Sequence, residues 1–208
     1  FLFMMAIGPK LKWIKSQLKD KIYLVSFLII SILLAFLVLK NFNQNVLINT
    51  ILISSALYLF FMTLRDFFVK KYKNISQNIA HFGFSLLILS ILFNNLFASE
   101  IITNLKVGET FENSKTKIVF ESVNQKKEQN YNVIIANFSI SNSNGEEDRL
   151  FPELRIYNQP VIATSEADIK TTLMSDKFIV INLVQNQDFF NVRYQVKPFM
   201  LWIWLSVI

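Results

Sequence analysis

Three long runs of apolar residues occupy the first half of the chain. They cover residues 22–39, 46–64 and 79–98 and are 18, 19 and 20 residues long. The first two contain no charge, and the third is interrupted only by His81 and a pair of asparagines. Roughly 20 helical residues cross the hydrocarbon core of a bilayer, where backbone must hydrogen-bond within its own segment. The pattern therefore predicts three transmembrane helices rather than three buried helices of a large soluble protein.

Both ends of the chain are apolar as well. Apolar residues dominate segment 1–9 and again segment 198–208. We expect these segments to be the end of one further membrane helix and the start of another. The chain is therefore interpreted as part of a longer protein, and no cleavable signal peptide is recognised in it.

Basic residues are concentrated in two of the segments between the apolar runs. Segment 10–21 holds five Lys and one Asp, and segment 65–78 holds four basic residues and one acid. Segment 40–45 has one charged residue, Lys40. Short loops rich in Lys and Arg stay in the cytoplasm. The pattern therefore predicts that 10–21 and 65–78 are cytoplasmic and that 40–45 and 99–197 lie on the outer side.

From residue 99 onward the chain changes to short alternating segments. The alternation, or an enrichment in β-branched and aromatic residues, is clearest at 117–123, 131–141, 177–184 and 189–196. A period of two is typical of half-buried strands. We predict five or six strands over 99–197, arranged as a small β sandwich or barrel. The predicted fold class is an α-helical multi-spanning membrane protein with an inserted extracytoplasmic all-β domain.

The formal net charge of +6 does not indicate a nucleic-acid-binding protein. Residues 1–98 carry ten basic and two acidic residues (+8), whereas residues 99–208 carry eleven and thirteen (−2). The positive charge thus lies between apolar runs and forms no separate basic domain. The chain has no cysteine, which excludes disulfides, thiolate metal sites and a cysteine nucleophile.

His81 is the only histidine of the chain and stands in the third apolar run. Ionisable side chains inside membrane segments are costly and are often functional. A neutral imidazole is also a common axial ligand of haem iron. The alternative is an interfacial histidine that hydrogen-bonds a loop carbonyl. Gly83, two residues on, removes side-chain bulk and lets either a flat macrocycle or another helix approach.

Other polar residues give weaker indications, and we assign no catalytic residue. Ser85 stands four residues after His81, a spacing that supports a hydrogen bond, but no acid is nearby. The acidic run 146–148 is interpreted as a solvated loop. Glu166 and Asp168 are spaced to hold a cation, although a structural or partner-binding role is the simpler interpretation. No metal other than a haem iron is expected.

Several short motifs occur in a fixed order along almost the whole chain. They are Gly8-Pro9 with Lys12-Trp13, Ala80-His81-Phe82-Gly83, Lys106-Val107-Gly108-Glu109, Phe151-Pro152-Glu153 with Arg155 and Tyr157, Ser165-Glu166-Ala167-Asp168-Ile169, Asp176, Val192-Arg193, Lys197-Pro198-Phe199, and Trp202-Ile203-Trp204. In this order they resemble the C-terminal region of the CcmF and NrfE family of cytochrome c-type biogenesis proteins. The chain departs from that pattern at Ser165, where Thr is usual, at Asn182-Leu183, and in lacking a glycine after the last motif.

The resemblance implies a haem-lyase subunit of cytochrome c maturation. It places the protein in the inner membrane of a bacterium or a mitochondrion, with 99–197 in the periplasm or intermembrane space. It also implies haem b bound in the membrane by two helix histidines. His81 matches the second of these, Gly83 belongs to the same motif, and the first lies outside this chain.

The implied partners are a haem chaperone, other maturation subunits, apocytochrome c and membrane lipid, and they include no nucleic acid. The complete family member promotes thioether bonds between haem vinyl groups and thiols of the apocytochrome. We do not expect this chain alone to be active. Two alternatives remain, a membrane-anchored assembly scaffold without cofactor and an NrfE-type paralogue that serves a dedicated haem site. The scaffold alternative predicts that His81→Ala changes nothing.

Overall fold

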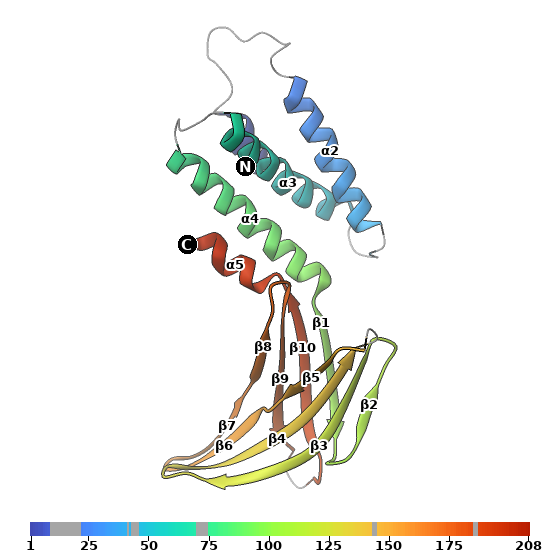
Figure 1. The fold of residues 1–208 in the computed structure, drawn as a ribbon, viewed down its shortest axis with the longest axis vertical. Helices are drawn as coiled ribbons and strands as arrows, with labels where there is room; N and C mark the ends of the chain where they lie inside the picture. Colours follow the sequence, from blue (N-terminus) through green and yellow to red (C-terminus); the bar gives the residue numbers. More distant parts are fainter. Residues whose placement is uncertain (9–21, 41, 43–45, 70–74, 143–144, 185–186) are drawn as a thin grey trace. The chain divides into compact units, whose positions relative to one another are not determined.

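The structure, a computed structural model, consists of two compact units (Figure 1). It describes residues 1–8, 22–40, 42, 46–69, 75–142, 145–184 and 187–208. Residues Phe1–Leu96 and Trp202–Ile208 form the helical unit, and Phe97–Leu201 form the β unit. The predicted basic segment 10–21 and most of segment 40–45 lie outside the described residues. The membrane orientation derived from them stays a prediction.

The helical unit is built from apolar segments without internal proline. Its described helices are α1 (Leu2–Ile7), α2 (Ile22–Leu39), α3 (Val46–Val69), α4 (Ile75–Phe97) and α5 (Met200–Val207), the first residues of α5 belonging to the β unit. By length and composition, α2, α3 and α4 are able to cross a membrane. Helix α3 ends at Val69 rather than at residue 64, and α4 begins at Ile75 rather than at residue 79. The apolar run marks only the part suited to hydrocarbon, whereas the hydrogen-bonded helix continues into the polar boundary.

Small residues bring α2 and α3 together. Ser31 and Ala35 of α2, four residues apart on one face, are fully buried. Ala56 of α3 is also fully buried, and Ser54 beside it is nearly so. Small side chains let helix backbones approach closely, which stabilises packing in a lipid environment. The Ser31 hydroxyl donates to the Phe27 carbonyl at 2.7 Å, so its burial leaves no unpaired donor.

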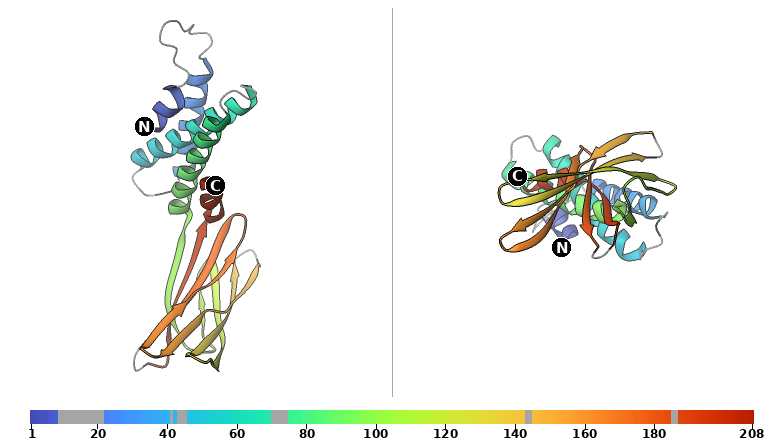
Figure 2. Two further views of the ribbon diagram at one scale, coloured as in Figure 1. Left: turned by 90° about the vertical axis from the view of Figure 1, so that its left-hand side faces the viewer. Right: turned by 90° about the horizontal axis from the view of Figure 1, so that it is seen from below.

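The β unit is a sandwich of two antiparallel sheets (Figures 1 and 2). Its strands are β1 (Ser99–Leu105), β2 (Thr110–Glu112), β3 (Thr116–Lys127), β4 (Tyr131–Asn142), β5 (Glu147–Leu150), β6 (Glu153–Asn158), β7 (Val161–Glu166), β8 (Asp168–Thr171), β9 (Ser175–Leu183) and β10 (Phe190–Pro198). One sheet has the order β1-β10-β9-β8; the other has the order β2-β3-β4-β6-β7, with β5 paired to β4. The predicted number of five or six strands is wrong, because β2, β5 and β8 are too short to show alternation.

Inward-facing residues of both sheets form one apolar core. Phe120 of β3 stacks on Phe138 of β4 with ring centroids 4.5 Å apart, and Phe190 of β10 meets Phe120 edge-on at 5.5 Å. Such ring pairs add about 0.5–1.5 kcal/mol each beyond their buried area. Tyr194 of β10 is buried on the same face, as its period-two pattern predicts. Alternation on β10 therefore identified a core strand.

Gly108 is required where β1 turns into β2. Its φ of +88° lies in the left-handed region, which side chains rarely adopt. The turn is closed by the Glu109 amide, which donates to the Lys106 carbonyl at 3.0 Å. The Glu109 carboxylate in turn accepts from the Lys106 amide at 2.8 Å. The motif at residues 106–109 is thus a turn that follows the first strand.

The helical membrane part and the inserted all-β domain confirm the predicted architecture, and the extracytoplasmic position of that domain stays a prediction. Among the alternatives of sandwich and barrel, the two separate sheets show the sandwich.

Candidate functional site

His81 lies deeper in its helix than the apolar run indicated. Helix α4 begins at Ile75, so His81 is its seventh residue and stands nearly two turns from the helix start. The imidazole is partly buried and has no hydrogen-bond partner among the described residues. The alternative role, in which His81 bonds a loop carbonyl, is therefore not seen in the described part of the chain.

Aromatic contacts beside His81 hold α4 against α3. The Phe82 ring lies 5.2 Å from the Phe60 ring and 5.8 Å from the Phe67 ring. Ser85, one turn after His81, is fully buried, and its hydroxyl donates to the Phe82 carbonyl at 2.8 Å. The His81–Ser85 hydrogen bond that the sequence spacing supports is not formed. The Phe82 contacts show which face of α4 packs against α3.

Gly83 is approached by a helix, which is one of the two roles expected from the sequence. A Cβ at Gly83 would lie 2.8 Å from the Ser206 carbonyl oxygen of α5. Residues two apart in a helix are about 200° apart around its axis, so Gly83 and His81 face opposite ways. The structure therefore does not bring these two residues together on one face of α4.

The residues around His81 fit one axial ligand of a haem. An imidazole that has no hydrogen-bond partner among the described residues can coordinate iron, and the part of α4 that follows His81 is mostly apolar. Within the described residues, no group of three His, Cys, Asp or Glu side chains is arranged to hold a metal ion. His81 is the only histidine in the chain, so a second histidine ligand would come from outside it.

The sequence predicted a loop at Arg65 and Asp66, but this charged pair lies near the end of α3. Asp66 is only 6% exposed, and Arg65 lies with its guanidinium carbon 3.7 Å from the centre of the Tyr23 ring of α2. The signal was the apolar triplet after these residues, Phe67 to Val69, which continues the helix. The pair anchors α3 to α2 through a cation–π contact.

Asp148 forms a buried ion cluster that joins the two sheets. The expectation that 146–148 is a solvated loop is wrong for this residue, which is 6% exposed on β5. One carboxylate oxygen accepts from Lys170 of β8 at 2.5 Å and the other from Lys177 of β9 at 2.7 Å. Burial acts to raise the pKa of Asp148, but these two hydrogen bonds outweigh it and lower the pKa overall. The sequence alone does not show that Asp148, the third of three consecutive acidic residues, faces inward.

Tyr194 lies on β10 near this cluster. Its hydroxyl is buried without a hydrogen-bond partner among the described residues. Burial, together with the negative charge of Asp148, raises the pKa of Tyr194 to about 12. The phenol therefore stays protonated at all physiological pH values.

Asp168 has a structural role. Its Oδ2 accepts a hydrogen bond from the Phe151 amide at 2.6 Å, which ties the start of β8 to the segment before β6. Glu166 ends β7, and the described residues place no third carboxylate or histidine with this pair for a metal ion. The structural interpretation of the two acids is the better one.

The Pro-Glu-x-Arg-x-Tyr motif lies on β6 with its three long polar side chains on the outer face. Arg155 donates to the Glu153 carboxylate at 2.8 Å and stands 5.4 Å from the Tyr131 ring centre. Tyr131 and Tyr157 are cross-strand partners with rings 5.3 Å apart. The motif thus stabilises the pairing of β4 with β6.

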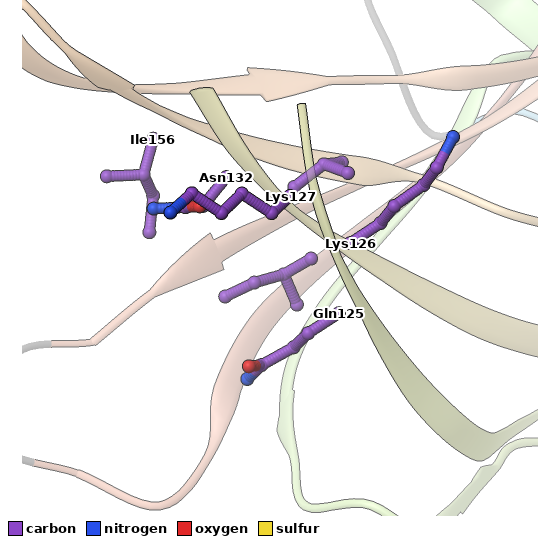
Figure 3. A pocket seen from close by; sticks show the side chains of 7 residues that line it. Gln125, Lys126, Lys127, Asn132 and Ile156 are labelled. Carbon is purple, nitrogen blue, oxygen red and sulfur yellow. The ribbon is translucent and has the colours of Figure 1, made fainter. Parts of the chain in front are cut away.

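A cavity of about 410 Å³ opens at one end of the six-stranded sheet (Figure 3). It is lined by Gln125, Lys126, Lys127, Asn132, Val133, Ile134 and Ile156. Nothing in the sequence singled out these residues, because they come from three strands and only the sheet register assembles them.

Comparison with known proteins gives one consistent family. The model of the CcmF C-terminal beta-sandwich matches residues 96–198. The cytochrome c-type biogenesis protein CcmF of Haemophilus influenzae is 24% identical over 99% of this chain and 34% of its own length. The CcmF protein of Escherichia coli is 22% identical over 98% of this chain and 33% of its own length.

A solved structure supports the same fold. The structure of a cytochrome c heme lyase CcmF aligns with a TM-score of 0.71 at 19% identity, covering 99% of this chain and 36% of that one. The chain spans about a third of the length of these relatives. The chain belongs to the CcmF family of membrane proteins and corresponds to the C-terminal region of its members.

Proposed function

We propose that this chain is the C-terminal part of a haem-lyase subunit in cytochrome c maturation. The observation that carries the proposal is a match to CcmF over nearly the whole chain, combined with a His81 in an apolar helix that has no hydrogen-bond partner among the described residues. The complete protein would bind haem b in the membrane and help to attach haem to apocytochrome c. Its partners would be a haem chaperone and the other maturation subunits.

His81 acts as an axial ligand in this proposal. When bound there, haem b supplies one-electron chemistry, with a potential tuned by its axial ligands. Phe82, next to His81, holds this part of α4 against α3 through its ring contacts with Phe60 and Phe67. Gly83 allows α5 to pack closely on the opposite face of α4. The second ligand would come from the part of the protein outside this chain.

The β unit lies on the outer side of the membrane in this proposal. For a chain in the inner membrane of a bacterium or a mitochondrion, that side is the periplasm or the intermembrane space. The basic segments between the helices favour this orientation, because Lys and Arg in short loops remain cytoplasmic. The sandwich would then dock assembly partners or apocytochrome. The lack of cysteine in the chain fits this role, since the thiols that form thioether bonds belong to the substrate.

A visible spectrum tests the proposal. The complete protein containing this chain is purified, and haem is quantified by a pyridine haemochrome assay in wild type and in His81→Ala. Gln77→Ala is a matched control, because Gln77 lies one turn before His81 on the same face of α4. We expect a b-type spectrum that is lost in His81→Ala and kept in Gln77→Ala. A haem-free wild type, or an unchanged His81→Ala spectrum, would favour the scaffold alternative.

A further inference from the structure

The inner face of the six-stranded sheet changes from apolar to polar toward one end. On β3 the inward positions after the core residue Val123 are Gln125 and Lys127. The register continues across the sheet in two adjacent rows. The inner row is Gln125, Ile134, Leu154 and Ser165, and the end row is Lys127, Asn132, Ile156 and Ala163. Inward positions of a sandwich are normally apolar, so a lysine and two carboxamides there need an explanation.

The four-stranded sheet covers the inner row at Leu154 and Ser165, whereas Gln125 of that row and most of the end row are exposed. Leu154 is 3% exposed, and the Ser165 hydroxyl donates to Asn182 of β9 at 2.6 Å. One row further out, Ala163 is exposed, and Val161 beyond it on the same face is 82% exposed. Within the described residues, the sandwich therefore has one end at which the inner face of β3, β4, β6 and β7 has no facing strand.

The cavity of about 410 Å³ lies at this open end. Figure 3 shows the Lys127 side chain extending toward Asn132 and Ile156, whereas Lys126 points away. Lys126 is paired with Glu128 at 2.6 Å. Lys127 has no ion pair or hydrogen bond through its side chain among the described residues. In the described part of the chain, the cavity thus presents the ammonium group of Lys127 without an ion pair, beside the apolar side chains of Ile134 and Ile156.

The side chains that line the cavity indicate which kind of ligand it binds. The ammonium of Lys127 donates hydrogen bonds only, and the carboxamides of Gln125 and Asn132 add N–H donors on the same face. A carboxylate matches this set by charge and by acceptor number. Ile134 and Ile156 supply an apolar surface beside it. We propose that the open end of the sandwich binds a segment of a partner protein that carries a carboxylate next to an apolar side chain.

Charge argues against the other occupants. Recognition of anionic lipid takes clusters of 4–8 basic residues at the membrane surface. Among the described residues that line this cavity, Lys127 is the one lysine without an ion pair. A symmetric contact between two copies would bring the same patch of both together, and the residues that line this cavity include two lysines and no acid to pair with them. Like charges disfavour that contact, so a partner of opposite charge fits best.

This inference deepens the docking role given to the β unit in the proposed function, and in assigning a partner it rests on that function. The two remain separable by experiment. Peptide binding at the open end involves no haem, and the His81 spectrum involves no residue of this cavity. A failure of one measurement therefore leaves the other informative.

Paired peptides test the proposal on the full chain in detergent. The probes are acetyl-Leu-Glu-Leu-amide and acetyl-Leu-Gln-Leu-amide, which differ only in the carboxylate, and their dissociation constants are measured by ligand-observed NMR. The variants are Lys127→Gln and the matched control Lys117→Gln, whose lysine also lies on β3 but is paired with Glu112 at 3.7 Å and does not line the cavity. Vesicles of phosphatidylglycerol and a measurement of mass in solution cover the other occupants.

We expect wild type to bind the glutamate peptide about tenfold more tightly than the glutamine peptide, as a charge-assisted hydrogen bond predicts. Lys127→Gln should remove this preference, and Lys117→Gln should retain it. Equal binding of the two peptides by wild type overturns the proposal, as does loss of the preference in both variants. Vesicle binding or dimer formation that depends on Lys127, with no peptide preference, also overturns it.

Discussion

Removing the carboxylate of Asp148 should lower the free energy of unfolding of the β unit more than removing an exposed carboxylate does. Asp148 on β5 belongs to the six-stranded sheet, whereas Lys170 on β8 and Lys177 on β9 belong to the other. Asp148→Ala therefore breaks a link between the two sheets. It also removes the carboxylate that lies 2.7 Å from the ammonium of Lys177, and the Lys177 side chain is only 11% exposed.

The magnitude follows from the burial of the two lysines. Breaking a buried ion pair by removing one partner costs about 3–5 kcal/mol, because the other charge stays desolvated. Two features favour the lower end of that range. Lys170 is 49% exposed and can regain water, and the Glu146 carboxylate stays 3.9 Å from Lys177. We therefore expect a loss of about 3 kcal/mol, a large part of the 5–15 kcal/mol typical of a whole domain.

A thiol reporter measures this loss in the full chain. Because the sequence has no cysteine, Ala136→Cys introduces a single thiol at a fully buried core position. Its labelling rate under native conditions reports the population of the opened β unit. A loss of about 3 kcal/mol raises that rate about a hundredfold. Glu146→Gln is the matched control, and its exposed carboxylate at 3.9 Å predicts a change of less than about 1 kcal/mol.

A double-mutant cycle separates the ion pair from general effects of the substitution. Asp148→Ala combined with Lys177→Met removes both charges, so the double variant should lose clearly less than the sum of the two single variants. Equal labelling rates in Asp148→Ala and Glu146→Gln would refute the reasoning. So would strict additivity of the two single losses.

Three further predictions concern pH, a buried phenol and a helix contact. The pKa of Asp148 is lowered in the folded state, so the ionised carboxylate contributes its full stabilisation above about pH 4, the pKa of an unfolded Asp. This stabilisation is lost as the pH falls through the pKa of the folded state. The urea midpoint should therefore decline below pH 4 in wild type and decline less in Asp148→Ala. Tyr194→Phe removes an unpartnered buried hydroxyl, so it should not destabilise the β unit and should delete the phenol that ionises near pH 12 in an absorbance titration. Gly83→Ala forces a Cβ to within 2.8 Å of the Ser206 carbonyl and should lower the thermal midpoint of the helical unit, at a cost of about 1–3 kcal/mol, whereas Gly8→Ala meets nothing within 4 Å and should not.

The sequence predicted those parts of the molecule in which each element carries its own pattern. Helices α2, α3 and α4 follow from apolar length, and β10 follows from alternation that leaves Val192 and Tyr194 buried. Gln195, assigned to the polar side of β10, is also buried, because its side chain donates to Glu100 of β1 at 2.5 Å. That partner is 95 residues away in the sequence, so no local pattern could reveal it.

The candidate sites show the same division. His81 was identified from one residue type in one apolar run, and its lack of a partner required coordinates. The burial of Asp148 and the exposed position of Lys127 depend on which strands lie opposite each other. Gly83 and His81 do not form one site, because residues two apart in a helix lie on opposite faces.

Chemical rescue at His81 tests the central claim most directly. In the complete protein, His81→Gly leaves a space for free imidazole in place of the side chain, and the visible spectrum is recorded as imidazole is added. The account predicts that the b-type absorption is lost in His81→Gly and returns with imidazole. A spectrum that is normal in His81→Gly without imidazole would contradict the claim that His81 is an axial ligand.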